Sequence, residues 1–311
     1  MRSPLSVNAD DLRLLIAVAR TGRMVAAAAA LGLDHTTIGR RIRRLEADLG
    51  ATLLVRSTDG WELTELGRMI ADRANEIDVI VDEVRGIAAG EAGALRGTVR
   101  IAAPDGFGTA FVAPVLARVL REHPGVTPEL VTSSRPVSAR GTGFDLSVNI
   151  GAPPSGRVAS EHLTRYTLGL FASRSYLAER GPVTAQAHLS RHPLVFYVES
   201  LLSVEELDLL RSFSGPRMGL GSTNVLAQVA ATRAGAGIGL LPHFLAGDGT
   251  GAGTPQEAGD ELVPVLPREV RFDLEFSLSV RRESRDSDVV AVVRRELHRE
   301  VAERRGELLG P

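Results

Sequence analysis

The chain has 311 residues, 44% of them hydrophobic and 24% charged, which is enough for two or three domains with sizeable cores. It has no cysteine, which excludes disulfide frameworks, thiolate metal sites and cysteine nucleophiles. Its 36 basic and 38 acidic residues nearly cancel, and the net charge of −2 alone argues against a nucleic-acid binder. Asp10 and Asp11 stand where a signal peptide needs apolar residues, and no apolar stretch approaches the about 20 residues of a membrane span. We therefore expect a cytoplasmic protein without membrane contact.

Three helices are predicted within the first 50 residues. The first is amphipathic, follows a capping Asn8 and ends near Gly22, and the second is an alanine-rich helix over residues 24–31. Gly32 interrupts the pattern, and a third helix begins near His35. Its apolar residues repeat at 4-3-4 spacing: Ile38, Ile42, Leu45 and Leu49. Two helices joined by a short glycine-containing turn are typical of a helix-turn-helix, whose second helix enters the DNA major groove.

The third helix is the most basic part of the chain. Residues 35–44 contain four arginines and no acid. At 100° per residue the apolar positions fix the buried face, and Arg41 falls near its edge. The residues opposite or flanking that face are Thr36, Thr37, Arg40, Arg43 and Arg44. Arginine can read guanine and a threonine methyl can contact thymine, so this surface favours DNA binding over the alternative of a merely solvated charged helix.

The next segment predicts a wing and a long helix. Two β-prone runs flank Asp59-Gly60 within residues 53–63, a strong hairpin signal. A helix then runs from about Thr64 to about Ala89, with apolar residues about every 3.5 residues, the coiled-coil period. Those residues are Leu66, Ile70, Ala74, Ile77, Val81, Val84 and Ala88. A helix lying on its own domain is the alternative, but the length of the repeat favours a dimerisation helix and a homodimer.

Beyond a linker marked by Gly90, Gly93 and Gly97, strands alternate with helices. This alternation predicts an α/β domain with mainly parallel strands, and its restart near residue 166 with a late return segment predicts two hinged lobes rather than one continuous sheet. The predicted strands cover 98–103, 126–131, 144–150, 166–172, 194–198, 237–241 and 272–280, and the predicted helices 106–122, 224–234 and 288–305.

The chain offers no catalytic, cofactor or metal motif. Gly235–Gly239 fails the dinucleotide pattern because Leu240 occupies the last glycine position, and Gly247–Gly253 lacks the Lys-Ser/Thr ending of a P-loop. His188 and His192 have the spacing of a helical pair, but Pro193 ends any helix there and no carboxylate completes a metal set. We therefore expect a turn, a surface loop and two structural histidines at these places, and no enzyme.

Short motifs recur in a fixed order along the chain. In the first ninety residues they are Asp11-Leu12, Ala26-Ala27, Leu31, Ile42, Leu45-Glu46, Leu49-Gly50, Leu53–Arg56, Leu63-Thr64 and Gly67. In the second half they are Phe144–Val148, Tyr176–Gly181 and Gly235–Pro242. Their order and spacing, from about residue 8 to about residue 300, resemble those of LysR-type transcriptional regulators. The resemblance implies a winged helix-turn-helix, a linker helix and a periplasmic-binding-protein-like α/β effector domain of two hinged lobes. We expect boundaries at 1–63, 64–90 and 91–311, with lobe 1 at about 97–165 and 271–305 and lobe 2 at about 166–270.

This resemblance implies a sequence-specific regulator gated by a small-molecule effector of unknown identity. Two-fold symmetry then implies an inverted-repeat operator, and Arg56, which matches the arginine of the family's wing, implies a phosphate contact. The chain departs from the family at Gly39, where serine is usual. It also departs in residues 132–143, where proline and glycines replace a helix that normally pairs effector domains. Dimer and tetramer therefore both stay open.

The effector site is expected outside the carboxyl ends of the strands, where ligands bind in open α/β sheets. The turn after the first effector-domain strand corresponds to the family's first ligand-contacting segment. The expected site residues are Asp105, Gly106, Phe107, Thr109, Ser133, Ile150, Tyr197, Asn224 and Ile238. Asp105 either caps the following helix or repels acids and selects an amine or a hydroxyl group, so we predict an effector less acidic than the carboxylates common in the family.

Two other classes of function compete with a regulator. The second half alone resembles a periplasmic solute-binding protein, but the helix-turn-helix and the acidic N-terminus argue against that reading. An α/β enzyme fused to a helical module is disfavoured because no nucleophile–base arrangement occurs. A gel shift with the DNA upstream of the chain's own coding sequence separates the regulator from both.

Overall fold

The computed structural model describes residues 7–21, 24–57, 60–88, 95–133, 144–151, 159–198, 217–247 and 261–310. The N-terminal part contains the three predicted helices: α1 (Ala9–Thr21), α2 (Met24–Ala30) and α3 (His35–Leu49). The Asp34 side chain caps α3 by accepting the N–H of Thr36 at 2.8 Å. Gly50 ends the helix in the left-handed region at φ 66°. The local signals in the sequence therefore set both ends of the helix that carries the arginines.

The predicted wing is confirmed in its two strands. β1 (Leu54–Ser57) pairs antiparallel with β2 (Gly60–Leu63), and the predicted turn at residues 58–59 lies outside the described residues. Glu46 of α3 holds the wing, because its Oε1 accepts the N–H groups of Leu53 and Leu54 at 2.7 and 3.1 Å. The helix and the wing thus form one unit around a shared core.

In the long helix α4 (Glu65–Ala88), not every residue of the predicted apolar repeat is available to a second chain. Ala74 is only 2% exposed and, with Ile70, packs into the core of the N-terminal domain. These two residues therefore belong to the chain's own domain and not to a contact between chains. Further along, Ile80 and Val84 are 57% and 58% exposed, so the second half of α4 keeps apolar surface that a partner could cover. Leu66 and Met69 near its start are exposed as well.

The first part of the effector domain is a parallel sheet covered by helices. β3 (Arg96–Ala103) pairs parallel with β4 (Gly125–Thr132) and β5 (Leu146–Ile150). The expected helix after β3 runs continuously as α5 (Asp105–Phe107), a π-helical turn (Gly108–Val112) and α6 (Ala113–Glu122). One expectation needs correction, because Gly97 lies inside β3 and not in the linker. The last two residues of β5, Asn149 and Ile150, are half-buried.

The second part repeats the pattern. Its parallel strands are β7 (Pro193–Phe196), β8 (Arg217–Gly221) and β9 (Ile238–Pro242). Its helices are α7 (Arg174–Arg180), a 3₁₀ helix (Gln186–Arg191), α8 (Val225–Arg233) and α9 (His243–Ala246). Gly235 at φ 79° and Gly237 at φ 151° make the turn between α8 and β9, as expected from the sequence. Of the loop expected at Gly247–Gly253, Gly247 follows α9 and residues 248–253 lie outside the described residues.

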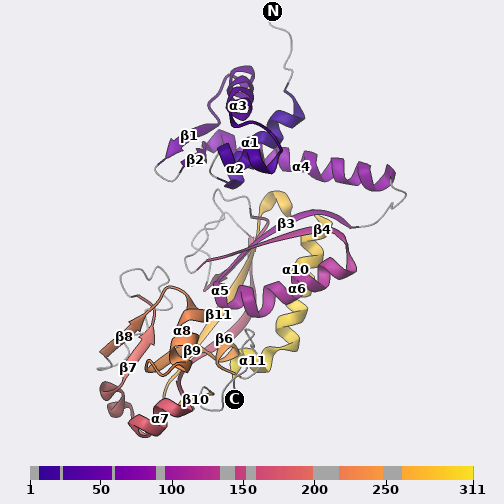
Figure 1. The fold of residues 1–311 in the computed structure, drawn as a ribbon. Coiled ribbons are helices and arrows are strands. Elements are labelled where there is room, and N and C mark those ends of the chain that lie inside the picture. Colours follow the sequence, from indigo (N-terminus) through magenta and orange to yellow (C-terminus); the bar gives the residue numbers. More distant parts are fainter. Residues whose placement is uncertain are drawn as a thin grey trace, which may run out of the picture.

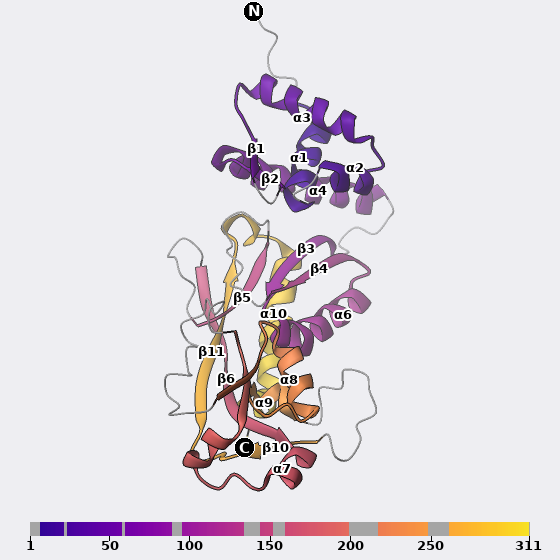
Figure 2. The same ribbon diagram turned by 60° about the vertical axis from the view of Figure 1, so that its left-hand side comes forward.

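Two long strands join the lobes, and this overturns the expectation of separate sheets. β6 (Ala159–Ser173) and β11 (Arg271–Val280) are antiparallel and run lengthwise through the effector domain (Figures 1 and 2). β11 pairs with β5, β6 pairs with β9, and the strand order is β4-β3-β5-β11-β6-β9-β7-β8, with β10 (Leu262–Val265) also on β6. The sheet is therefore continuous and mixed rather than mainly parallel.

Helices at the end of the chain complete the domain. α10 (Asp288–Glu303) covers lobe 1, and α11 (Arg305–Leu309) follows it beside β6 and α9. Arg118 of α6 is bound to Glu300 of α10 at 2.8 Å, which fixes the two helices against each other. Within the described ranges, no helix combines the length and the apolar character that a membrane crossing requires.

Candidate nucleic-acid interface and ligand cleft

The basic helix α3 lies at the outer end of the N-terminal domain. In Figures 1 and 2, α3 lies at the end of the N-terminal domain opposite the effector domain. Ile38, Ile42 and Leu45 are buried beneath it, as the helical spacing predicts. Thr36, Arg40, Arg43 and Arg44 are exposed, and Thr37 is half-buried. The predicted surface therefore exists as one contiguous helix face.

Three of the four arginines of α3 have a hydrogen-bond or ion-pair partner within the chain. Arg41 donates from Nε to Asp11 of α1 at 2.5 Å, and Arg44 lies 3.7 Å from Asp48. Arg43 donates to the carbonyl of Gly39 at 3.0 Å. The acids that balance this helix thus come from α1 and from its own last turn, outside the ten-residue window that contains no acid.

Arg40 differs from the other three arginines. Its side chain is exposed and makes no hydrogen bond or ion pair with any residue in the described part of the chain. Arg56 is likewise exposed, on β1 opposite Trp61 in the strand register. A guanidinium without an internal partner is available to base edges or phosphates of DNA.

The cleft predicted to bind the effector contains a buried carboxylate. Asp105 follows β3, as expected, and is 6% exposed. Its Oδ1 accepts the N–H of Gly106 at 3.1 Å, and its Oδ2 accepts the N–H of Val225 in α8 at 3.2 Å. Burial raises the pKa of Asp105, and this effect outweighs the hydrogen bonds, which lower it. The carboxylate therefore joins the first turn of lobe 1 to the first turn of a helix in lobe 2.

The space around Asp105 is small and mostly apolar. The cavity has a volume of about 30 Å³, roughly the share of one water molecule in the liquid. Its lining residues are Pro104, Asp105, Gly106, Phe107, Ile150, Tyr166, Leu168, Tyr197, Val225, Leu240, Pro242, Phe244 and Phe276. A Cβ on Gly106 would lie 2.7 Å from side-chain atoms of Leu245 and Val225, so the lobes are in direct contact here.

Five of the nine predicted effector residues line this cavity: Asp105, Gly106, Phe107, Ile150 and Tyr197. The other four do not. Thr109 is exposed and donates its hydroxyl to the carbonyl of Asp105 at 2.8 Å, and Asn224 caps α8 by accepting the N–H of Ala227. The N–H of Ser133 is bonded to Ala103, and Ile238 is in the core of lobe 2. Ile238 shares the face of Leu240 and Pro242 by the alternation of β9, but it lies at the start of the strand, whereas the cavity is lined from Leu240 to the carboxyl end.

Eight lining residues were not in the expected set: Pro104, Tyr166, Leu168, Val225, Leu240, Pro242, Phe244 and Phe276. Four of them, Tyr166, Leu168, Phe244 and Phe276, come from the crossing strands and from α9. Tyr166 and Phe276 stack with ring centroids 4.2 Å apart, and Phe107 lies 4.4 Å from Phe276. The alternation of Tyr166 and Leu168 along β6 is a period-2 signal that could have placed them on one face. Their meeting with the turn of lobe 1 depends on long-range strand pairing.

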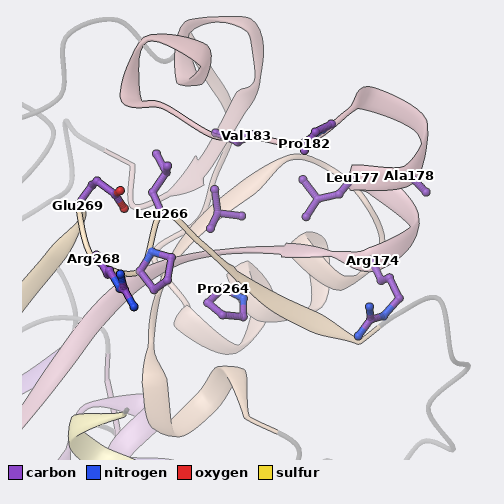
Figure 3. Close-up of a pocket in the computed structure, with 11 residues that line it drawn as sticks. Arg174, Leu177, Ala178, Pro182, Val183, Pro264, Leu266, Arg268 and Glu269 are labelled. Atoms are coloured by element: carbon purple, nitrogen blue, oxygen red, sulfur yellow. The ribbon is translucent and has the colours of Figure 1, made fainter.

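Two larger hollows lie away from the cleft. One of about 620 Å³ is an open groove on the surface of lobe 2, between α7 and the segment Pro264–Glu269 (Figure 3). Arg174 and Arg268 lie at its rim, and its walls are mainly proline, leucine and valine side chains. Another of about 390 Å³ lies between α9, β10 and α11. The effector cleft expected from the strand ends is therefore the least spacious of the three.

His188 and His192, the two histidines considered as metal ligands, have different hydrogen-bond partners. The buried His192 shares a hydrogen bond of 2.8 Å with the hydroxyl of Tyr176, and burial lowers its pKa. His188 accepts from the N–H of Thr184 at 3.4 Å. Among the described residues, no group of three or more histidine and acidic side chains is arranged to hold a metal ion.

Two family models match the chain. The bacterial regulatory helix-turn-helix protein model of the lysR family matches residues 9–68, and the LysR substrate binding domain model matches residues 92–302. The HTH-type transcriptional regulator PtxR of Pseudomonas aeruginosa is 31% identical over 248 residues, which are 77% of this chain and 78% of that protein. These matches cover the interface on α3 and the cleft around Asp105 alike.

Solved structures share the fold over nearly the full length. ArgP from Mycobacterium tuberculosis has a TM-score of 0.66 at 20% identity, with 96% of this chain and 98% of that chain covered. Full-length CbnR in complex with its target DNA has a TM-score of 0.56 at 22% identity, with 94% and 100% covered. Both likenesses extend from the N-terminal helices through the two-lobed domain.

Proposed function

Because the chain belongs to the LysR family of transcriptional regulators, we propose that it reads an inverted-repeat DNA site as a homodimer through α3 and the wing. It is a DNA-binding transcriptional regulator with a substrate-binding effector domain. The chain carries no catalytic motif, and we propose that it is no enzyme and acts in the cytoplasm, where bacterial DNA is. We assign residues 1–63 to DNA binding, 64–90 to dimerisation and 91–311 to effector binding.

The single observation that carries the DNA-binding proposal is the exposed face of α3. On it the exposed Arg40 lies near Thr36 and Arg43 and makes no hydrogen bond or ion pair with the described part of the chain. We assign base contacts in the major groove to these three residues, because arginine reads guanine bidentately. Thr37 and Arg44 flank them and contact the sugar-phosphate backbone. Arg56 in the wing holds a phosphate, which adds affinity without sequence preference.

We assign the effector site to the contact between the lobes around Asp105. In this state the cavity of about 30 Å³ admits a single small group, so a larger effector requires the lobes to move apart at this contact. Such a movement would be transmitted through β6 and β11, which belong to both lobes. Effector binding would then alter the separation of the two recognition helices in the dimer.

A gel shift tests the DNA-binding proposal. The full chain is titrated against the DNA upstream of its own coding sequence and against a scrambled fragment of equal length. We expect a discrete complex with the first fragment at concentrations that leave the second unbound. Equal binding of both fragments would contradict sequence-specific regulation at this site, because phosphate contacts alone do not discriminate.

A further inference from the structure

The carboxylate of Asp105 has unused capacity to accept hydrogen bonds. An ionised carboxylate has about four acceptor positions on its two oxygens. Two are taken by the N–H groups of Gly106 and Val225. Because Asp105 also lines the cavity, a donor placed there can reach the carboxylate. The carboxylate therefore keeps free acceptor capacity in its present state.

No cation of the described chain balances this charge. Asp105 is the only ionised side chain among the described residues that line the cavity, and it forms no ion pair with the described part of the chain. Burying a carboxylate without a counter-charge is costly, and the raised pKa of Asp105 reflects that cost. A positively charged ligand group would remove it, whereas a second carboxylate would add to it.

The walls of the cavity also suit a cation. Phe107, Tyr166, Phe244 and Phe276 pack in one aromatic cluster next to Asp105, with centroids of neighbouring rings 4.2 to 6.5 Å apart. Aromatic faces attract cations, and more strongly where water is excluded. Burial and the charge of Asp105 both raise the pKa of Tyr197, so its hydroxyl stays protonated beside the carboxylate. An apolar ligand body would find its partners in the same cluster.

The size of the cavity also fits a small cationic group. The cavity of about 30 Å³ holds one water-sized group, and an ammonium head group is of that size. We propose, on the basis of the effector site assigned above, that the cleft binds a primary amine with an apolar or aromatic body. The ammonium lies on Asp105, and the body lies between the aromatic rings after the lobes separate. This proposal narrows the sequence-based expectation of a non-acidic effector to a cation.

Three probes of matched shape and different charge test the proposal on the full chain. They are 2-phenylethylamine, 2-phenylethanol and 3-phenylpropanoate, titrated at pH 7 by calorimetry. The amine is protonated at this pH because alkylammonium groups titrate near 10. We expect the amine to bind about tenfold or more tighter than the alcohol, as one added charge-assisted contact implies, and the acid to bind more weakly than the alcohol. Equal affinities for amine and alcohol, the tightest binding for the acid, or no saturable amine binding at millimolar concentration would overturn the proposal.

Asp105→Asn provides the matched variant, because it keeps the shape and one acceptor oxygen and removes the charge. We expect the preference for the amine over the alcohol to fall to about equal affinities in this variant. An unchanged preference would place the amine elsewhere and overturn the proposal. The comparison of probes on the unaltered chain needs no variant, so the test stands even where the substitution disturbs folding.

A parallel measurement separates the ligand class from the regulatory role. The same probes are added to the complex of the full chain with its upstream DNA. Amine binding at Asp105 without any change in the DNA complex would support the ligand class and contradict gating at this cleft. A change in the DNA complex caused by the acid and not by the amine would overturn the ligand class and leave the gating assignment in place.

Discussion

The carboxylate of Asp105 and the backbone N–H of Val225 lie 3.2 Å apart although 120 residues separate them in the chain. This contact joins the first turn of lobe 1 to the first turn of α8 in lobe 2. The carboxylate lines the same cavity as the aromatic side chains of Phe107, Tyr166, Phe244 and Phe276. The charge of this one group therefore bears on the contact between the lobes and on the ligand class proposed above.

Asp105→Asn is expected to change the pH dependence of stability. Burial raises the pKa of Asp105 in the folded state, so the unaltered chain carries no penalty from this group below its unfolded pKa of about 3.9. It loses stability as the pH rises through the raised folded pKa. The asparagine variant has no such titration. Its free energy of unfolding relative to the unaltered chain should rise from pH 4 upward and then level off, as measured by urea denaturation. A relative stability that falls over this range would contradict burial of the charge.

Arg56→Ala is expected to weaken binding to all DNA sequences alike. Arg56 is exposed on β1 and is assigned to a phosphate, so its removal should lower the slope of log K against log salt by about 1 per half-site. Fluorescence anisotropy at several salt concentrations, with upstream and scrambled DNA, measures both quantities. Loss of sequence preference in this variant would instead assign Arg56 to a base.

Replacing Ile80 and Val84 together with glutamine is expected to disrupt the dimer. Both side chains are more than half exposed on α4, whereas Ile70 and Ala74 are committed to the chain's own core. Light scattering of the double variant should give the monomer mass at concentrations where the unaltered chain is dimeric. Leu120→Gln removes a similarly exposed apolar side chain from α6 and should leave the mass unchanged. A double variant that stays dimeric would show that this part of α4 does not pair the chains.

Gly39→Ala is expected to stabilise the N-terminal domain. Glycine within a helix costs about 0.5 to 1 kcal/mol relative to alanine. A Cβ at this position would meet only Arg43 and Met24 at 3.7 Å, which is ordinary van der Waals contact. The free energy of unfolding should therefore increase by about that amount in denaturant titrations. A decrease would mean that the added methyl disturbs the packing of α3 against Met24 of α2.

Local signals in the sequence predicted the DNA-binding half well. Asp34 and Gly50 cap α3 through contacts within a few residues, and the helical period alone separates Ile42 from Arg40. The same period could not predict that Ala74 packs into its own domain. An apolar residue gives the same sequence pattern whether it contacts its own domain or a second chain. Only part of the cleft could be predicted, because some of its residues meet through contacts that are distant in the sequence. Asp105 follows from the end of a strand, whereas Tyr166 and Phe276 reach it only through the pairing of β6 with β11, which spans about a hundred residues.

The central claim is that the exposed face of α3 reads DNA sequence, and one titration tests it most directly. The full chain, Arg40→Ala and Arg121→Ala are titrated by fluorescence anisotropy against upstream and scrambled DNA at one salt concentration. Arg121 lies on α6 of the effector domain and controls for the loss of one positive charge. We predict that Arg40→Ala loses about 1 to 3 kcal/mol of discrimination between the two fragments, the value of a bidentate base contact, and that Arg121→Ala loses none. Full discrimination retained by Arg40→Ala would contradict the assignment of α3 as the recognition helix.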